Sequence, residues 1–344
     1  MTHTARAVAG EALRSLADRF WDGYLSAYPT WATVIGDRRF DDRLENVSPA
    51  AIAARVDWLD EIAAAAKAIV PDGLSPTERV TRQMLVDEAA GQAASIRTGT
   101  HEWTVDPLSG PAVTLLDLVD YQPIRTPDEG RAMVARWRGI GDYLDERGAG
   151  LRRAAGEGRV AVRNPVERVI DVLRGLDAMP PEEWKLASPA AVEHEGWSTG
   201  DHEAFRKELR GAVREVAVPA FRRYREILEG EILPAARPQE RPGIVHVPGG
   251  AEAYRTWIRV HTTLELEPEA LHATGLAEIE RIDAEFVELG RRVLGTKDLE
   301  STLAALRDDP RLRFDRADEV FETAKRSLVR AQAAIGGWFG RVPG

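Results

Sequence analysis

The sequence contains no cysteine, which excludes disulfide bonds and thiolate metal sites from its 344 residues. No apolar run approaches the ~20 residues of a membrane-spanning helix, and residues 1–10 lack the apolar core of a signal peptide. The formal charge is -10, with Arg and Lys mixed among Asp and Glu, which argues against generic nucleic-acid binding. We therefore expect a cytoplasmic protein with neither a nucleic-acid partner nor a membrane partner.

Helix start signals recur along the chain, whose 44% hydrophobic and 30% charged residues are typical of a globular protein. The signals that resemble capping boxes are Ser75-Pro76-Thr77-Glu78, Thr126-Pro127-Asp128-Glu129 and Asn164-Pro165-Val166-Glu167. Their irregular spacing favours a complex helical array over a solenoid. We expect an all-α fold, a single α-helical region over residues 1–344 with a subdivision near residues 234–250.

Two segments depart from plain helix patterns. The run from Pro242 to Pro248 predicts at most a short β element, near residues 243–248. Residues 202–233 read as one long helix with Pro219 inside it. Because an internal proline removes a backbone hydrogen bond and crowds the preceding turn, we expect a kink or break near Val218.

Polar groups suited to ligand contact are most concentrated after Tyr254. Together with His261, Thr262 and Thr263, Tyr254 makes up the candidate substrate-cleft residues. One interpretation is that the threonine hydroxyls satisfy backbone groups where a helix ends. The other is that they line a cleft.

A second helix is expected to begin at Pro268, because the missing N–H of proline costs nothing at a first helical position. Its apolar residues recur at helical spacing, which predicts one buried face. These residues are Leu271, Leu276, Ile279, Ile282 and Phe286.

The 7 histidines do not form a recognisable metal motif. A helical zinc peptidase needs His-Glu-x-x-His, but Ser198 occupies the second ligand position after His194 and no ligand follows His202 at that spacing. We interpret both as surface features. His261 and His272 would lie about 16 Å apart even on one continuous helix. We therefore assign no metal ligand and no catalytic residue to this chain.

Two further groups have a structural interpretation that we favour over a functional one. Asp37, Asp41 and Asp42 could bind a cation, but the arginines interspersed with them offer ion pairs. The nine tryptophans sit at helical or loop-packing positions and are expected in the core rather than around a ligand.

Several short motifs occur in order along the whole chain. They are Phe20-Trp21-x-x-Tyr24-Leu25-x-x-x-Pro29-Thr30-x-Ala32-Thr33-x-x-Gly36-Asp37, Asp41-Asp42-Arg43-Leu44, Pro127-Asp128-Glu129, Leu233-Pro234-Ala235-Ala236-Arg237, and Tyr254 through His261-Thr262-Thr263 to Pro268-Glu269-x-x-His272-x-x-Gly275. In this order they resemble the family called domain of unknown function 885, bacterial proteins regarded as zinc metallopeptidases.

This resemblance implies one half of a fold similar to thimet oligopeptidase and angiotensin-converting enzyme, in which two helical halves flank a peptide cleft. The family's zinc motif, His-Glu-x-x-Pro-Gly-His, lies beyond the segments matched here. The resemblance therefore implies the N-terminal part of a longer peptidase. Zinc, a peptide substrate and a C-terminal catalytic half belong to the full-length protein, while this chain has no cofactor and is inactive alone.

Tyr254, Thr262 and Thr263 carry over from the family only as motif positions. The alternative function is a non-catalytic helical peptide- or protein-binding module derived from the same family. Trp338 and Phe339 lie close to the last residue, so we also expect an exposed apolar patch near the final helix.

Overall fold

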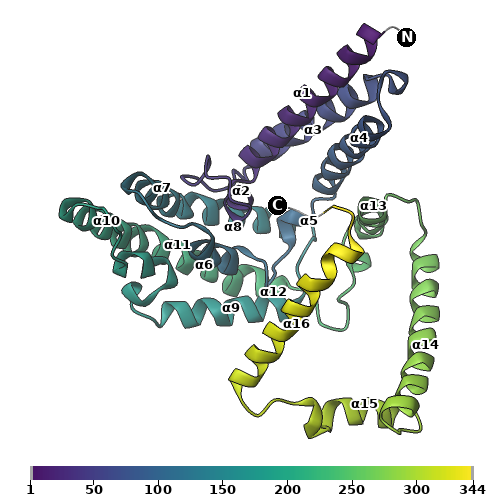
Figure 1. Ribbon diagram of the computed structural model, residues 1–344. Coiled ribbons are helices and arrows are strands. Elements are labelled where there is room, and N and C mark those ends of the chain that lie inside the picture. The colour runs from purple at the N-terminus through teal and green to yellow at the C-terminus, as the bar shows by residue number, and fades with distance from the viewer. Residues whose placement is uncertain (1–2, 342–344) are drawn as a thin grey trace. The chain divides into compact units, whose positions relative to one another are not determined.

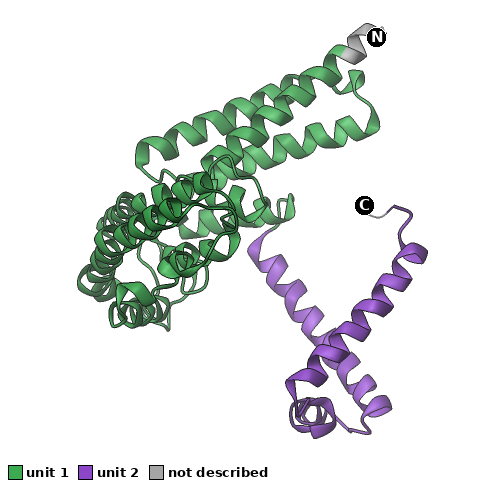
Figure 2. Ribbon diagram, turned by 60° about the vertical axis from the view of Figure 1, so that its left-hand side comes forward, with its two compact units in different colours: residues 1–266 green, residues 267–344 purple. Residues whose placement is uncertain are grey.

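Helices dominate the computed structural model, which describes residues 3–341 (Figure 1). Among these residues the one β-type pairing is an isolated bridge between Val162 and Arg237. The predicted all-α fold is therefore confirmed. No helix in the described range is long and apolar enough to cross a membrane. The chain divides into two compact units, residues 1–266 and residues 267–344 (Figure 2).

The first unit begins with three long helices that lie side by side (Figures 1 and 2). The elements of this part are α1 (His3–Ala27), the short α2 (Pro29–Val34), α3 (Pro49–Ala68), η1 (Pro71–Gly73) and α4 (Pro76–Arg97). Their apolar stripes meet in one core around Leu13, Leu59 and Leu85. Glycine sets the close approach of α1 to α3, because a Cβ added at Gly23 would lie 2.3 Å from the indole of Trp58.

A second group of helices surrounds the largest core of the same unit. Its elements are α6 (Pro111–Tyr121), α7 (Pro127–Arg138), α8 (Ile140–Gly156), α9 (Arg163–Asp177), η2 (Pro181–Glu183), η3 (Lys185–Ala191), α10 (Thr199–Ala212), η4 (Val213–Ala217), α11 (Val218–Ile227), η5 (Leu228–Ile232) and α12 (Leu233–Ala235). Outside this core, α5 (Thr100–Trp103) and η6 (Ile244–His246) meet in a small apolar cluster, and α13 (Gly250–Thr262) packs against α4 and η6. Trp137 is fully buried in this core, and its indole N–H donates to the Leu186 carbonyl at 3.0 Å. The core thus holds a large polar-tipped side chain with its hydrogen bond satisfied.

Two of the three predicted capping boxes are confirmed. In the boxes that begin at Ser75 and Thr126, the hydroxyl accepts from the N3 backbone and the glutamate reaches back to the cap. The prediction at Asn164 is wrong, because α9 already begins at Arg163 without a side-chain cap. The Arg163 N–H instead donates to the Arg237 carbonyl at 2.8 Å, so a tertiary contact takes the place of a cap.

Near Val218, where a kink or break was predicted, the structure has a π-helical turn within a continuing helix. Helix α10 runs directly into the π turn η4 before α11 begins. A second π turn, η5, precedes Pro234 in the same way and was not predicted. Because a proline ring crowds the carbonyl four residues earlier and offers it no N–H, a locally wider turn accommodates the ring inside a continuing helix.

The short β element predicted near residues 243–248 is wrong. Residues Ile244–His246 form the 3₁₀ turn η6, in which the His246 N–H donates to the Gly243 carbonyl at 3.1 Å. Prolines 242 and 248 bracket the segment, and a residue without an N–H cannot contribute to a strand ladder.

The second unit contains α14 (Pro268–Val293), α15 (Leu299–Asp308), η7 (Pro310–Leu312) and α16 (Ala317–Trp338). Helix α14 begins at Pro268 as predicted, but its predicted buried face is wrong, since Leu276 and Ile279 are 50% and 56% exposed. The contact of α14 with α15 is made instead through Gly290, where an added Cβ would lie 2.2 Å from the Thr302 hydroxyl. Apolar side chains of α16 are exposed, as expected near the final helix; they include Phe321, Leu328, Val329 and Trp338.

Candidate functional site

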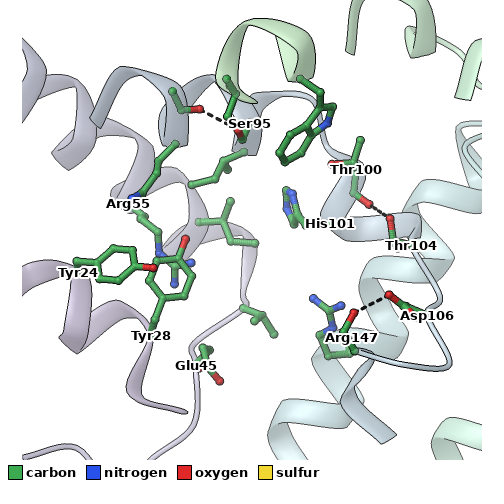
Figure 3. Close-up of a pocket in the computed structure, with 18 of the residues that line it drawn as sticks. Tyr24, Tyr28, Glu45, Arg55, Ser95, Thr100, His101, Thr104, Asp106 and Arg147 are labelled. Carbon is green, nitrogen blue, oxygen red and sulfur yellow. Dashed lines mark hydrogen bonds between the residues drawn. The ribbon is translucent and has the colours of Figure 1, made fainter. Parts of the chain in front are cut away.

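A cavity of about 690 Å³ lies within the first unit (Figure 3). Its walls come from α1, α3, α4, α5, α8 and α13, together with loop residues near Glu45 and Asp106. Helix α13 approaches α4 closely at Gly91, where an added Cβ would lie 3.8 Å from the side chain of Val260. The volume is in the range of small-molecule and peptide side-chain sites.

Two arginines from different helices bring positive charge into the cavity (Figure 3). The Arg55 guanidinium lies 4.7 Å from the centre of the Tyr28 ring and donates to the carbonyls of Ala27 and Asn46 at 3.4 Å. Arg147, on α8, has no hydrogen-bond or ion-pair partner among residues 8–341. A guanidinium carries five donor N–H groups, so the cavity contains unused donor capacity at Arg147.

The four carboxylates of the cavity wall already accept hydrogen bonds from other protein groups. Glu45 accepts from the Thr30 N–H at 3.1 Å, Asp87 from the Gln83 amide at 2.9 Å, Glu88 from the Gln92 amide at 2.8 Å, and Asp106 from the Leu108 N–H at 2.8 Å and the Ser109 hydroxyl at 2.5 Å. The Ser109 hydroxyl, with the Leu108 N–H, lowers the pKa of Asp106. These contacts hold the carboxylates in place, and none of them pairs with Arg147.

Two polar atoms in the wall, Nε2 of His101 and Oε1 of Gln92, are buried without a partner. The orientation of the Gln92 amide is fixed, because its nitrogen donates to the Glu88 carboxylate and leaves the oxygen as an acceptor. Burial lowers the pKa of His101, with Glu102 opposing and Arg147 adding to the decrease, so the imidazole is neutral at pH 7. Buried polar groups are nearly always hydrogen-bonded, and these two atoms therefore mark a place for a polar ligand or ordered water.

Aromatic side chains line the remaining wall of the cavity. They come from α1 (Tyr24), from the cap of α2 (Tyr28, whose ring centre lies 4.9 Å from that of Tyr24), from α8 (Tyr143) and from α13 (Trp257). Burial raises the pKa of Tyr143 to about 12, which keeps its hydroxyl protonated and able to donate. Flat aromatic faces beside a few polar groups are typical of ligand sites.

The four predicted cleft residues lie on or just after α13, outside the cavity lining. Helix α13 contributes Trp257 and Val260 to the lining instead. Tyr254 is 46% exposed, and the His261 ring stacks on Trp257 with centres 5.4 Å apart. The four residues are therefore not among those that line this cavity, and their contact with a substrate stays a prediction.

The two threonines of the group hydrogen-bond to the backbone at the end of α13. The Thr262 hydroxyl donates to the Ile258 carbonyl at 2.7 Å and accepts from the Leu264 N–H at 3.1 Å. Thr263 adopts a left-handed conformation with φ of 60°, and its hydroxyl donates to the Thr262 carbonyl at 2.6 Å. This geometry fits the interpretation that they satisfy a helix end, and a contact with substrate stays a prediction.

Sequence reasoning missed Gln92, His101, Arg147 and Trp257 as cavity residues. Trp257 was expected in the core, although its position four residues before His261 places the two on one face of a helix. Arg147 follows Tyr143 at the same spacing on α8. No sequence signal distinguishes this arginine from the many that form ion pairs, because the distinction depends on which helices meet around it.

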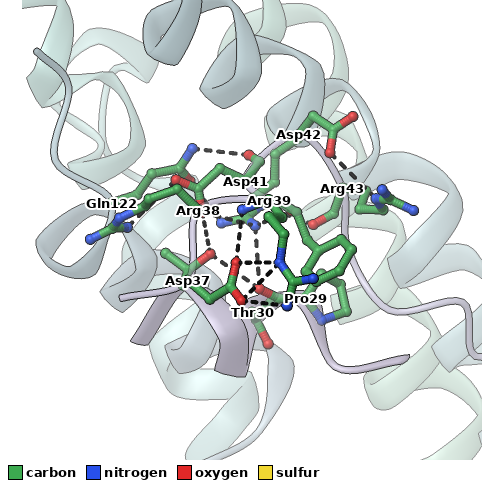
Figure 4. A network of polar contacts seen from close by, with 12 residues as sticks. Pro29, Thr30, Asp37, Arg38, Arg39, Asp41, Asp42, Arg43 and Gln122 are labelled. Atoms are coloured by element: carbon green, nitrogen blue, oxygen red, sulfur yellow. Dashed lines mark hydrogen bonds and ion pairs between the residues drawn. The ribbon is translucent and has the colours of Figure 1, made fainter. Parts of the chain in front are cut away.

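The acidic loop considered as a cation site is held by arginines instead (Figure 4). Asp37 accepts from Arg39 at 2.7 Å, and this hydrogen bond lowers the pKa of Asp37. Asp41 is buried and accepts from the Thr33 hydroxyl at 2.6 Å. Asp42 pairs with the neighbouring arginine at 3.4 Å. The carboxylates therefore serve as partners for cationic side chains that fold the loop.

Arg136 of α7 fixes this loop from within the core. Its side chain is fully buried and donates to the carbonyls of Phe40 and Arg43 at 2.7 and 2.9 Å, and to the Gln122 amide oxygen at 2.7 Å. Burial lowers the pKa of Arg136 to about 10, and the nearby charge of Asp41 opposes the decrease. The loop that leads to Glu45 in the cavity wall is thus anchored by a buried cation.

The interpretation of His202 as a surface feature is wrong. The residue is 9% exposed; its Nε2 accepts from the His194 N–H at 2.9 Å and its Nδ1 lies 3.1 Å from the Ser198 carbonyl. Both contacts lie at the start of α10, so the ring fixes the turn that leads into this helix.

Metal-binding side chains are not grouped in the described part of the chain. Among the side chains that the structure describes, those of residues 8–341, no three His, Asp or Glu lie close enough together to hold a metal ion. These residues therefore do not fit the zinc site that the family resemblance implies for a longer protein.

Comparison with known proteins identifies a family and similar solved structures. Residues 29–344 match a family described as "Bacterial protein of unknown function (DUF885)". The fold is similar to that of "the putative lipoprotein from Colwellia psychrerythraea", with a TM-score of 0.81, 18% identity and coverage of 100% of this chain and 61% of that chain. It is also similar to "a putative lipoprotein of unknown function from Shewanella oneidensis", with a TM-score of 0.64, 14% identity and coverage of 94% and 57%. This chain spans less than two thirds of either protein, and no curated protein sequence matches it.

Proposed function

This chain belongs to the DUF885 family of bacterial proteins, and we propose that its first unit binds peptides, as the helical scaffold and cleft wall of a zinc-dependent peptidase. The observation that carries the proposal is the cavity of about 690 Å³, with aromatic walls and unpartnered polar groups. A peptide offers what these groups lack, namely amide N–H donors, carbonyl and carboxylate acceptors, and apolar side chains.

The part of the proposal that concerns hydrolysis rests on the family resemblance alone. Zinc would polarise a peptide carbonyl and activate water in the full-length protein. Because the side chains of residues 8–341 do not group three metal ligands, we assign these residues no catalytic step. Its role in the proposal is to bind and orient the peptide.

The face of α13 that carries Tyr254 and His261 is proposed to extend the peptide-binding wall beyond the cavity. The support is the stacking of His261 on Trp257, a residue of the cavity lining, which makes the two surfaces continuous. A Tyr254→Ala variant is expected to weaken peptide binding less than a Trp257→Ala variant does.

Calorimetric titration of the 344-residue chain with an equimolar pool of tripeptides tests the proposal. We expect saturable binding that is lost in Trp257→Ala and retained in Trp338→Ala, which removes an exposed tryptophan of α16. Binding that is absent from the unaltered chain, or equal in the two variants, would contradict the assignment of the site.

Zinc content and peptide hydrolysis distinguish the peptidase from its alternative. Both are to be measured on this chain and on the longest natural reading frame that contains it. Metal and activity in the longer form alone would support the scaffold role. Peptide binding with neither metal nor activity in either form would favour a non-catalytic peptide-binding module.

The cytoplasmic location of the protein is likewise a proposal, to be tested by cell fractionation.

A further inference from the structure

We propose that the cavity anchors a carboxylate of the bound peptide on Arg147 and receives an adjacent peptide N–H on the Gln92 side-chain oxygen. This inference rests on the proposed peptide binding and deepens it, because it defines which chemical group of the peptide the cavity selects. It assigns a binding role to residues outside the motifs that identify the family.

The carboxylates of the cavity wall have hydrogen-bond partners, but one of its two arginines does not. Each of the four wall carboxylates accepts a hydrogen bond from another protein group, whereas the Arg147 guanidinium has no partner within residues 8–341. A carboxylate is the ligand group that matches a planar guanidinium, through two parallel charge-assisted hydrogen bonds. A neutral peptide group would leave most of this donor capacity unused.

Two buried atoms of the wall, Gln92 Oε1 and His101 Nε2, lack hydrogen-bond partners. Gln92 Oε1 can only accept, because the amide nitrogen is held by Glu88, so its ligand must supply a donor. A peptide N–H is such a donor. His101 Nε2 is also buried, and burial together with the positive charge of Arg147 keeps this ring neutral, so it does not compete with Arg147 for the anion.

Arg147 shares the cavity wall with a tyrosine hydroxyl and an aromatic face. Tyr143 precedes it by one helical turn and presents a protonated hydroxyl, and Trp257 adds an apolar face. These groups suit a carboxylate next to an apolar side chain. Both a peptide C-terminus and an acidic side chain supply such a carboxylate, and the experiment distinguishes these sources.

Three synthetic peptides serve as probes of the full 344-residue chain in calorimetric titrations. Ala-Ala-Phe has a terminal carboxylate, Ala-Ala-Phe amide has none, and Ala-Glu-Phe amide has only a side-chain carboxylate. We expect at least one carboxylate-bearing peptide to bind tenfold or more tightly than Ala-Ala-Phe amide, since charge-assisted hydrogen bonds are about twice as strong as neutral ones. The tighter of the two identifies the source of the carboxylate.

Variants then assign the preference to named residues. Arg147→Met is expected to abolish the tenfold preference without changing the affinity for Ala-Ala-Phe amide. Gln92→Leu is expected to weaken all three peptides by a similar factor and to keep the preference. Arg152→Met is the matched control, because Arg152 lies on the same helix but pairs with Glu231 at the surface, 2.7 Å away; it should keep both affinity and preference.

The outcomes separate this inference from the proposed function beneath it. Equal affinity for the three peptides would overturn the carboxylate anchor and leave peptide binding intact. An equal loss of all three in Arg147→Met would assign that residue a structural role and overturn the inference as well. Failure of all three peptides to bind the unaltered chain would overturn the peptide-binding proposal itself.

Discussion

At the level of a single side chain, replacement of Arg136 should cause the largest decrease in the free energy of unfolding. Arg136→Leu would leave the carbonyls of Phe40 and Arg43 without their buried donor and Asp41 without its nearest buried cation. Removing one partner from such a network costs about 3 kcal/mol. We expect the free energy of unfolding in urea to fall by about that amount. Arg138→Leu, on the exposed side of the same helix, should change it by less than about 0.5 kcal/mol, and equal effects would contradict the anchoring role.

His101 should make a pH-dependent contribution to stability. Burial lowers its pKa in the folded chain, whereas the unfolded chain has the ordinary value of about 6.5. Between these two values the unfolded chain binds more protons, so the free energy of unfolding falls as the pH decreases below about 6.5. We expect the stability difference between the unaltered chain and His101→Gln to shrink from pH 7.5 to pH 5 in urea titrations. A difference that is constant with pH would contradict this burial of the imidazole.

Among the elements, α13 depends on a glycine at its first position. A Cβ at Gly250 would lie 1.7 Å from the Ile244 carbonyl oxygen, which is backbone and cannot rotate away. Gly250→Ala should therefore destabilise the chain by about 1–3 kcal/mol and, because α13 carries Trp257, weaken peptide binding. Gly156→Ala, at an exposed position with open space, is the control and should be neutral or slightly stabilising. Urea unfolding measures the stability of each variant, and calorimetry measures its peptide binding. Unchanged peptide binding in Gly250→Ala would contradict a role of α13 in the binding site.

The cap of α4 gives a second test at the level of an element. Ser75→Ala removes the hydroxyl that accepts from the Glu78 N–H, and loss of such a cap costs about 1 kcal/mol. Thr77→Ala, in the same turn, removes a hydroxyl with no part in the box and should change stability by less than about 0.5 kcal/mol. Equal effects in thermal unfolding would show that the box contributes nothing measurable.

Local signals in the sequence predicted these elements well. The capping boxes at Ser75 and Thr126 follow from residues within one turn of each other, and Pro219 marked the place of a local irregularity, though its form is a π turn and not the expected kink or break. The prediction failed where a distant residue decides the outcome. The start of α9 depends on the hydrogen bond from the Arg163 N–H to the Arg237 carbonyl. The apolar residues of α14 that begin at Leu271 recur at helical spacing, but no apolar side chains of the same unit bury them.

At the scale of the whole molecule, the all-α class was predictable and the cavity was not. Helix patterns determine the class because each is read from its own segment. The cavity combines Tyr24, Arg55, His101, Arg147 and Trp257, which come from five different helices. Their proximity depends on how these helices pack, and a single sequence contains no direct record of that packing. The four predicted cleft residues lie at or near the end of α13, whereas Trp257 and Val260 of that helix line the cavity.

The two units differ in the amount of apolar core, and all cavity residues lie in the first, before Leu266. Residues 1–266 contain both large apolar cores, whereas within residues 267–341 the fully buried residues are Gly290 and Thr302. Burial of apolar surface is the main favourable term in folding, so the second unit has little to offset the entropy of ordering α14 to α16. In the full chain, amides of these helices should exchange hydrogen faster than those of α8.

A fragment of residues 1–266 completes this test. It should unfold cooperatively and bind the tripeptide pool within about twofold of the full chain, since no lining residue is removed. The fragment of residues 267–344 should show little cooperative unfolding, because stable helices need an apolar face packed against a partner. Slow exchange in α14 to α16 would contradict the low stability inferred for the second unit. Loss of peptide binding from a folded 1–266 fragment would instead place part of the peptide site in the second unit.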